Sequence, residues 1–497
     1  MRADAIVRAG YARGAAWAVL SGGASIVLPL AVFVVFARAL GPEVIARFAL
    51  AVSLAEILKA CGLPGLYEAL LHRQSRPARG QAAALAVFLL IGLLLLPLHG
   101  AALVALFAAA GTDPSGSELL LLLLVGLRIP IDLALLQPQA ELARRAAYAR
   151  LAARGLVGNL GATTLGFAIL AAGQPMLGFA AYTLGISVGN ALATVVGTGT
   201  LRRPRWNGAC LKALWPEGLA ASAVRFCATA NNQLDQLLVG AIAGPLPFAQ
   251  FNFAKRIEAA FGSLSAILAT SLFQPDFAAR AKVATLAAGL RQALTIVAMT
   301  CGAVAAGFAV SADLFIGILL GPAWIAAAPA AAVLAVSGYG RAIGSVHAAL
   351  LSVSGRNASL FRRFALTIVV GAALIAVVAR YGALASALAV AVQILLGVVL
   401  LAVTTRHDAG GQALRIHLVH AVLPFLAMLA FAASARWTVL GFAWTADVPT
   451  MGSSIAAIMA ASAAAAMVGL ACGAAQMRHA WRPAPDVVLP AEPAWRT

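Results

Sequence analysis

The sequence predicts an all-α integral membrane protein with about fourteen transmembrane helices, and two observations support this prediction. Of the 497 residues, 62% are hydrophobic and only 10% are charged, whereas soluble globular proteins carry about 25% charged residues. Apolar runs of about 20 residues recur along the whole chain, each long enough to cross a hydrocarbon core about 30 Å thick. In lipid such runs form helices, because every backbone polar group must be paired within its own segment.

The first apolar run follows Arg2, Arg8 and Arg13 and extends from about Ala15 to Ala37. It is longer than the 7–15 residues of a signal-peptide core, so we expect an uncleaved first helix. Polar turns and turns containing Gly or Pro separate the later runs. The expected helices cover residues 15–37, 48–67, 82–109, 118–138, 153–172, 176–198, 216–243, 248–273, 287–310, 324–350, 361–379, 383–403, 418–435 and 452–474.

The basic residues predict the orientation of these helices. Loops on the side of the N-terminus hold 25 of the 35 Lys and Arg residues, and the opposite loops hold only Arg38, Arg47, Arg380 and Arg436. Cytoplasmic loops carry the excess of Lys and Arg, so both termini are expected in the cytoplasm. This distribution also explains the net charge of +18 without nucleic acid, because the cations lie between apolar runs and form no long basic tail.

A weak internal repeat divides the chain into two halves. Residues 41–51 read GPEVIARFALA and residues 244–254 read GPLPFAQFNFA, so Gly, Pro, Ala, Phe and Ala recur in the same order. Transporters are often built from such repeats, with the binding site between the halves. We expect an N-terminal lobe at 1–205 with helices 1–6, a C-terminal lobe at 206–405 with helices 7–12, and an addition at 406–497 that contains helices 13 and 14 and a cytoplasmic tail.

Six basic side chains fall inside the expected helices. They are Lys59, Arg128, Arg225, Lys255, Arg256 and Arg341. Each would cost roughly 2.5–3.5 kcal/mol at the centre of a bilayer on insertion scales. They are therefore expected to line a cavity, to pair with acids, or to extend to the membrane interface.

Three of these cations have an acid three or four residues away, which places both groups on one face of a helix. The pairs are Glu56 with Lys59, Arg128 with Asp132, and Lys255 with Glu258. They are either structural ion pairs or parts of a polar cavity. Arg256 and Arg341 have no acid at such a spacing, and the alternative for Arg341 is to extend to the cytoplasmic interface.

Helix 216–243 carries a polar stripe. At 100° per residue, Ser222, Arg225, Thr229, Asn232 and Gln236 fall within about 80° of one another, with Asp235 on the flank. Small polar residues also occur where helices pack, so Ser222 and Thr229 alone indicate little. The whole stripe predicts a water-filled cavity, whose cations suit an anionic head group. Asp235 is a candidate for taking up a proton or a sodium ion, and its alternative role is to neutralise a neighbouring cation.

The sequence predicts no cofactor and no metal site. The five cysteines are scattered and mostly inside apolar runs, so they indicate no disulfide framework. His417 and His420 are three residues apart but have no further ligand nearby in the sequence. The chain contains no Gly-Lys step and therefore no Walker-type phosphate loop, which excludes an ATP-driven pump formed by this chain alone.

Several motifs resemble those of one family of transporters. They are GAAW at 14–17, ARALGP at 37–42, FALAVSLAE at 48–56, ELARRAAYARLAARG at 141–155, DQLLVGAIAGPLPFAQFNFAKRI at 235–257, LLGPAW at 319–324, SGR at 354–356 and RYGALASALA at 380–389. On these motifs the chain resembles the polysaccharide-exporter and O-antigen flippase branch of the multidrug/oligosaccharidyl-lipid/polysaccharide exporter superfamily. Ala46, Ala249 and Phe251 stand where the family usually has Gly, Gly and Tyr.

The resemblance implies a fold like that of the MATE multidrug transporters, with a cationic cavity between two six-helix lobes. It implies a flippase, not an enzyme, that moves an undecaprenyl-diphosphate-linked oligosaccharide to the periplasmic leaflet of the bacterial inner membrane, for O-antigen, lipopolysaccharide or exopolysaccharide. It implies alternating access driven by a gradient of H⁺ or Na⁺, and partners among membrane lipids and polysaccharide polymerase or assembly proteins. In the segment 216–273 it points to Asp235, Lys255 and Arg256.

Two alternatives remain. Another exporter of the superfamily, for drugs or for the lipid precursor of peptidoglycan, would share the fold, although a pump for cationic drugs should favour intramembrane acids over cations. A membrane polymerase or glycosyltransferase would need catalytic groups on a substantial periplasmic loop, whereas the expected periplasmic connections, such as Gly173-Gln174-Pro175, are short.

Overall fold

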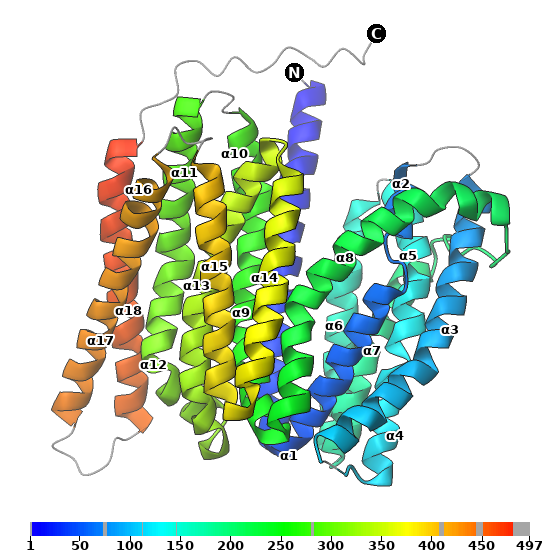
Figure 1. Cartoon of the computed structure of the whole chain (residues 1–497), viewed down its shortest axis with the longest axis horizontal. Helices are drawn as coiled ribbons and strands as arrows, with labels where there is room; N and C mark the ends of the chain where they lie inside the picture. The colour runs from blue at the N-terminus through cyan, green and yellow to red at the C-terminus, as the bar shows by residue number, and fades with distance from the viewer. Residues whose placement is uncertain are drawn as a thin grey trace. The chain divides into compact units, whose positions relative to one another are not determined.

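The computed structural model describes residues 2–72, 77–111, 113–145, 147–279, 283–406, 412–443 and 451–480. These residues form helices and short connections, with no strand among them (Figure 1). Some features expected from the sequence lie outside the described residues, namely Arg73, Arg76, Arg280, Lys282, Asp447 and the tail from residue 481.

The chain divides into two compact units, and unit 1 contains most of its first half. Unit 1 comprises Met1–Arg256, Leu319–Ala330 and Ile368–Val390. Within it, α3, α5, α6 and α7 run side by side (Figure 1). Its helices are α1 (Arg2–Cys61), α2 (Leu66–His72), α3 (Pro77–Ala109), α4 (Gly116–Val125), α5 (Arg128–Arg144), α6 (Tyr148–Ala171), α7 (Pro175–Val195), α8 (Gly208–Ala243) and the first half of α9 (Pro245–Leu268).

Unit 2 comprises Ile257–Ile318, Ala331–Thr367 and Ala391–Thr497. The units cut the chain at other points than the expected lobes, so the lobe boundaries stay a prediction. After α9 come η1 (Ala269–Phe273), α10 (Gln274–Ala279), α11 (Val283–Val297), η2 (Ala298–Gly302), α12 (Ala303–Leu319), η3 (Pro322–Ala327), α13 (Ala328–Val353), α14 (Asn357–Val378), η4 (Ala379–Tyr381), α15 (Ala383–Thr405), α16 (Ala413–His417), η5 (Leu418–Val422), α17 (Leu423–Ala443) and α18 (Met451–Ala480).

Each expected helix coincides with helical structure, and the differences lie at ends and breaks. The expected helix 48–67 stops at Cys61 and resumes as α2, and 118–138 is interrupted between α4 and α5. Helix 216–243 begins earlier, at Gly208. Within the described residues, ten helical segments are long and apolar enough to cross a membrane. The chain is thus a multi-pass membrane protein, while fourteen crossings and cytoplasmic termini stay predictions.

Three Gly-Pro steps form corners of the same backbone shape. Gly41 has φ 76° and ψ 171°, Gly244 has φ 83° and ψ 176°, and Gly321 has φ 88° and ψ 177°. Positive φ favours glycine, and the fixed φ of proline suits the first position of the helix that follows. The first two corners belong to the repeated sequences, so the repeat corresponds to a shared local structure.

An aromatic cluster fixes the start of α9 against α1 in unit 1. The ring of Phe33 lies 5.6 Å from that of Phe253 and 5.7 Å from that of Trp324. Trp324 is fully buried and its indole nitrogen donates to the carbonyl of Ala37 at 3.4 Å. Buried aromatic pairs add stability beyond area burial, so Lys255 and Arg256, which follow Phe253 in unit 1, are held at a defined place beside α1.

In unit 2, polar contacts dock α16–α18 onto the helices before them. Tyr339 on α13 donates its hydroxyl to the carbonyl of Ala421 at 2.9 Å, and its ring stacks on Phe425 at 4.3 Å. The carbonyl of Ala421 belongs to η5, a π-helical turn of the kind that interrupts the regular α-helical bonding. The helices expected as an addition after 405 are therefore packed into unit 2.

Candidate functional site

Five of the six candidate cations lie in unit 1. Lys59 is on α1, Arg128 on α5, Arg225 on α8, and Lys255 and Arg256 on α9, while Arg341 belongs to unit 2. The candidate site therefore consists of these five residues of unit 1 and their neighbours. That all six line one cavity stays a prediction.

Lys59 and Arg128 form one network with two acids. The Lys59 ammonium lies 2.8 Å from Glu56 and 2.7 Å from Asp132, and Arg128 lies 3.3 Å from Glu56. The expected Glu56–Lys59 pair is confirmed. The expected Arg128–Asp132 pair is wrong. Both residues face α1, where Arg128 pairs with Glu56 and Asp132 pairs with Lys59. Two cations and two acids leave this network neutral.

Arg225 pairs with an acid that the sequence analysis did not consider. Its Nε and Nη2 donate to Glu68 Oε1 at 2.8 and 2.5 Å, and its guanidinium lies 5.5 Å from the ring centre of Tyr67. Glu68 sits on α2, beyond the expected end of the second helix, where the turn at 62–65 brings α2 against α8. A lone acid in an apolar stretch was the only sequence signal for it.

Arg225 lies well before Asp235 along α8. The helix has 36 residues and begins at Gly208, so Arg225 is about 27 Å from the end at Ala243 at 1.5 Å per residue. It lies ten residues, or roughly 15 Å, before Asp235 along the helix axis. Because Lys255 contacts the helix at Asp235, about three helical turns separate it from Arg225 along α8.

The polar stripe of α8 has packed ends and a more open middle. Ser222 is buried and accepts the backbone N–H of Gly65 at 2.9 Å. Gln236 is buried and accepts a hydrogen bond from Asn252 on α9 at 2.5 Å. Between them, Thr229 is half-buried and Asn232 is exposed. The stripe thus contributes to helix packing at both ends, and the water-filled cavity stays a prediction for its middle.

Asp235 and Lys255 form a buried ion pair between α8 and α9. Their charged atoms are 2.5 Å apart, and the two side chains are 5% and 6% exposed. Asp235 also accepts the backbone N–H of Gln236 at 2.7 Å. This geometry fits the neutralising role considered for Asp235, whereas ion uptake there stays a prediction.

Arg341 has an acidic partner that is distant in the sequence. Its Nε pairs with Glu258, which is almost fully buried, and both residues belong to unit 2. Spacing along one helix could not identify this partner, because it lies on another helix. The Lys255–Glu258 pair expected from their spacing stays a prediction.

Arg256 is the exception among the six cations, since within the described residues it makes no ion pair with a carboxylate. Its Nε donates to Asn252 at 3.3 Å, and its guanidinium lies 4.5 Å above the ring of Phe33. Tyr182 on α7 is near enough to interact electrostatically with both Arg256 and Arg128. The other guanidinium nitrogens of this half-buried cation are thus candidates for binding an anion.

Arg154 is a further cation, at the start of the expected helix 153–172, that was not among the candidates. It lies on α6, where its Nε donates to the carbonyl of Leu151 at 3.1 Å. It interacts electrostatically with Asp132 and Tyr67, which adjoin the Lys59 network and Arg225 respectively. Arg154 was overlooked because it follows the run of Arg144, Arg145 and Arg150, whereas α6 begins at Tyr148 and carries Arg154 toward these groups.

Comparisons with known proteins bear on the family and the fold. A family model described as polysaccharide biosynthesis protein matches residues 35–329. A structure of the lipid II flippase MurJ in an inward closed conformation is similar with a TM-score of 0.71 and 14% identity, covering 94% of this chain and 99% of that chain. No curated protein matches the sequence.

Two structures of a multidrug resistance MATE family transporter of the MOP superfamily are also similar. The inward-facing one has a TM-score of 0.59 and 19% identity over 81% of this chain and 98% of that chain. The outward-facing one has a TM-score of 0.52 and 17% identity over 82% of this chain and 95% of that chain. The fold is that of MurJ and the MATE transporters, which confirms the fold class predicted from the sequence.

Proposed function

Because the chain belongs to the family of polysaccharide biosynthesis proteins, whose model matches residues 35–329, we propose that it flips a polyprenyl-diphosphate-linked oligosaccharide. The lipid-linked sugar moves from the cytoplasmic to the periplasmic leaflet of the bacterial inner membrane, where surface polysaccharide is assembled. Movement proceeds by alternating access and draws on a gradient of H⁺ or Na⁺. The fold is shared with a solved lipid II flippase, so a lipid is a class of cargo that this fold can carry.

The observation that carries the proposal is the environment of Arg256. Its neighbours Asn252 and Phe33 hold the guanidinium in place without neutralising it. A diphosphate carries the charge that prevents spontaneous crossing of hydrocarbon, and a guanidinium binds phosphate oxygens through two parallel N–H donors. Arg256 can therefore supply the first strong contact to the head group.

The cations that are paired with acids also suit a diphosphate head group, but each pair carries no net charge. Lys59 and Arg128 are balanced by Glu56 and Asp132, and Arg225 is balanced by Glu68. Ion pairs without net charge can hydrogen-bond to sugar hydroxyls of the head group. They also bind an anion less tightly than unpaired cations do, so that the anion can be released. Transport needs binding that is strong enough to enter and weak enough to leave.

The alternatives predict other lining chemistry. A pump for cationic drugs needs acids that face its cargo without cations, whereas Glu56, Glu68, Asp132 and Asp235 each pair with Lys or Arg. A flippase for the peptidoglycan lipid precursor would use the same diphosphate contact, and it is distinguished by which lipid accumulates. No observation on the described residues favours a polymerase or glycosyltransferase.

The test is export in a strain deleted for this gene and complemented with variants. Arg256→Ala is expected to leave the protein inserted but to stop export, with lipid-linked oligosaccharide accumulating on the cytoplasmic face. Arg256→Lys should rescue export in part, because it keeps the charge but loses the bidentate fork.

Arg380→Ala is the matched control, because Arg380 stacks on its neighbour Tyr381 in η4 at the protein surface. It should export normally. Accumulation of the peptidoglycan precursor instead of the oligosaccharide would move the assignment to the other flippase class. Normal export in the Arg225→Ala, Arg256→Ala double variant would rule out these arginines as carriers of the head group.

A further inference from the structure

The segment that joins α7 to α8 exposes both cations and large apolar side chains. Trp206 is 67% exposed and Trp215 is 45% exposed, and Arg203 and Arg205 are also exposed. Leu201, Lys212 and Leu219 complete the set, which we name the 201–219 surface. Exposed Trp beside Arg and Lys is typical of the interface between a bilayer and water.

The first turns of α8 are amphipathic in a way that matches this surface. Lys212, Trp215 and Leu219 lie within about 60° of one another on the helix, and all three are exposed. Leu211 and Leu214 lie on average about 100° away around the helix and are buried at 7% and 3% exposure. In Figure 1 this end of α8 passes across the ends of α2 and α3, helices that it also contacts. It therefore has one face packed on unit 1 and one face free.

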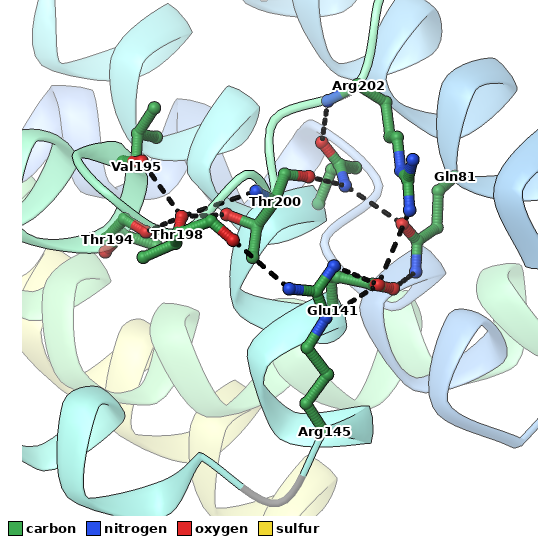
Figure 2. Close-up of polar contacts among 9 residues, drawn as sticks. Gln81, Glu141, Arg145, Thr194, Val195, Thr198, Thr200 and Arg202 are labelled. Carbon is green, nitrogen blue, oxygen red and sulfur yellow. Dashed lines mark hydrogen bonds and ion pairs between the residues drawn. The ribbon is translucent and has the colours of Figure 1, made fainter.

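A buried polar network holds the beginning of the surface in place (Figure 2). The Gln137 amide donates to the carbonyl of Thr200 at 3.0 Å and to Gln81 at 3.1 Å, and it accepts the backbone N–H of Arg202 at 3.2 Å. Gln81 in turn donates to Glu141. Gln81 and Gln137 are fully buried, so the network is desolvated and rigid once satisfied.

Further bonds extend this anchoring along the segment. Arg145 donates to the carbonyl of Thr198 at 3.1 Å and to Glu141 at 2.8 and 3.0 Å, as Figure 2 shows. Arg205 donates its backbone N–H to the carbonyl of Ala82 at 3.1 Å. Because the backbone is held, the side chains of Arg203, Arg205 and Trp206 are presented outward at fixed positions.

We infer that the 201–219 surface binds the head groups of anionic phospholipids in the leaflet next to this end of unit 1. The cations supply charge complementarity, and Trp206, Trp215, Leu201 and Leu219 supply apolar contact with the acyl boundary. A free phosphate ion would contact the cations but not the exposed indoles. An anionic lipid surface would contact both the cations and the apolar side chains of the 201–219 surface. The proposal concerns a lipid site apart from the transport cavity and does not rest on the proposed cargo.

The experiment measures tryptophan quenching in nanodiscs that contain phosphatidylglycerol and phosphatidylcholine in fixed proportion. Bromine is placed on the acyl chains of one lipid or of the other. The signal of Trp206 and Trp215 among the eight tryptophans is isolated by difference from a Trp206→Phe, Trp215→Phe variant. We expect stronger quenching of this signal when phosphatidylglycerol is brominated. Each cation near an anionic surface contributes roughly a fivefold preference, so Arg203→Gln, Arg205→Gln, Lys212→Gln should reduce the preference by on the order of a hundredfold if the three act additively.

The control replaces two exposed arginines elsewhere, Arg150→Gln and Arg415→Gln, and should keep the preference. A comparable loss per charge removed in this control would show that overall positive charge attracts the lipid, which would overturn the assignment to the 201–219 surface. Equal quenching by both brominated lipids in the wild type would also overturn it. Loss of the preference on adding millimolar inorganic phosphate would identify a free-anion site instead and refute the lipid assignment.

Discussion

Replacement of Asp235 by asparagine removes the carboxylate that lies 2.5 Å from the Lys255 ammonium. The two side chains are only 5% and 6% exposed, so solvent screens their interaction poorly. Breaking one partner of a buried pair typically destabilises a protein by about 3–5 kcal/mol, because the other charge remains buried. In a chain of this size we expect the apparent melting temperature to fall by roughly 3–10 °C.

The double variant Asp235→Asn, Lys255→Gln removes both charges and should recover most of this loss. In double-mutant cycles, residues in contact show interaction energies of about 0.5–3 kcal/mol. We expect a buried ion pair to lie at the upper end of this range. The assay is thermal unfolding of purified protein in one detergent at one scan rate, since membrane proteins often unfold irreversibly. Export in the deletion strain is measured for the same four proteins.

The outcome separates a structural pair from ion coupling. A structural pair predicts that Asp235→Asn loses both stability and export and that the double variant regains both. A double variant as stable as the wild type that exports nothing would refute this reasoning and identify Asp235 as a group that takes up the coupling ion. Equal stability of Asp235→Asn and the wild type would refute the energetic argument itself.

Two further predictions concern solvent access and topology. A cysteine at the exposed position of Asn232 should react with a small water-soluble thiol reagent in intact membranes, whereas a cysteine at buried Ala230 should not; equal labelling would remove the argument for an open middle of the stripe. Reporters fused after Arg145 or Arg203 should report cytoplasm, and one after Asp113 should report periplasm. Periplasmic activity after Arg203 would reverse the orientation.

The backbone architecture was largely predictable from the sequence. Apolar runs locate the helices because lipid permits no other spanning structure for them. The repeated Gly-Pro steps at Gly41 and Gly244 mark corners because glycine accepts positive φ and proline starts the next helix. The resemblance is confirmed for the polysaccharide biosynthesis family, whose model matches residues 35–329, and for the fold shared with MurJ and the MATE transporters, whereas the O-antigen branch stays a prediction.

The partners of the cations were not predictable, since they come from other helices. Spacing along one helix found Glu56 for Lys59, but Glu68 for Arg225 and Glu258 for Arg341 are brought close only by tertiary packing. The start of α8 was missed because its first turns are amphipathic and were not recognised by a search for continuous apolar runs. Both failures have one cause, namely that local periodicity carries no information about which distant surface a helix meets.

The observed pairings rank the cations by how readily each can serve an anionic head group. Among the residues that the structure describes, no carboxylate pairs with Arg256, so it needs only to reorient from Asn252 and Phe33. Arg225 and Glu68 are 41% and 30% exposed, and ion pairs at such exposure contribute about 0–1 kcal/mol, so a diphosphate can exchange for the carboxylate at little cost. Lys255 would have to leave a pair that is almost fully buried, which costs several kcal/mol. We therefore expect the head group to bind Arg256 during the whole of its passage and Arg225 only transiently. Lys255 keeps α8 and α9 together.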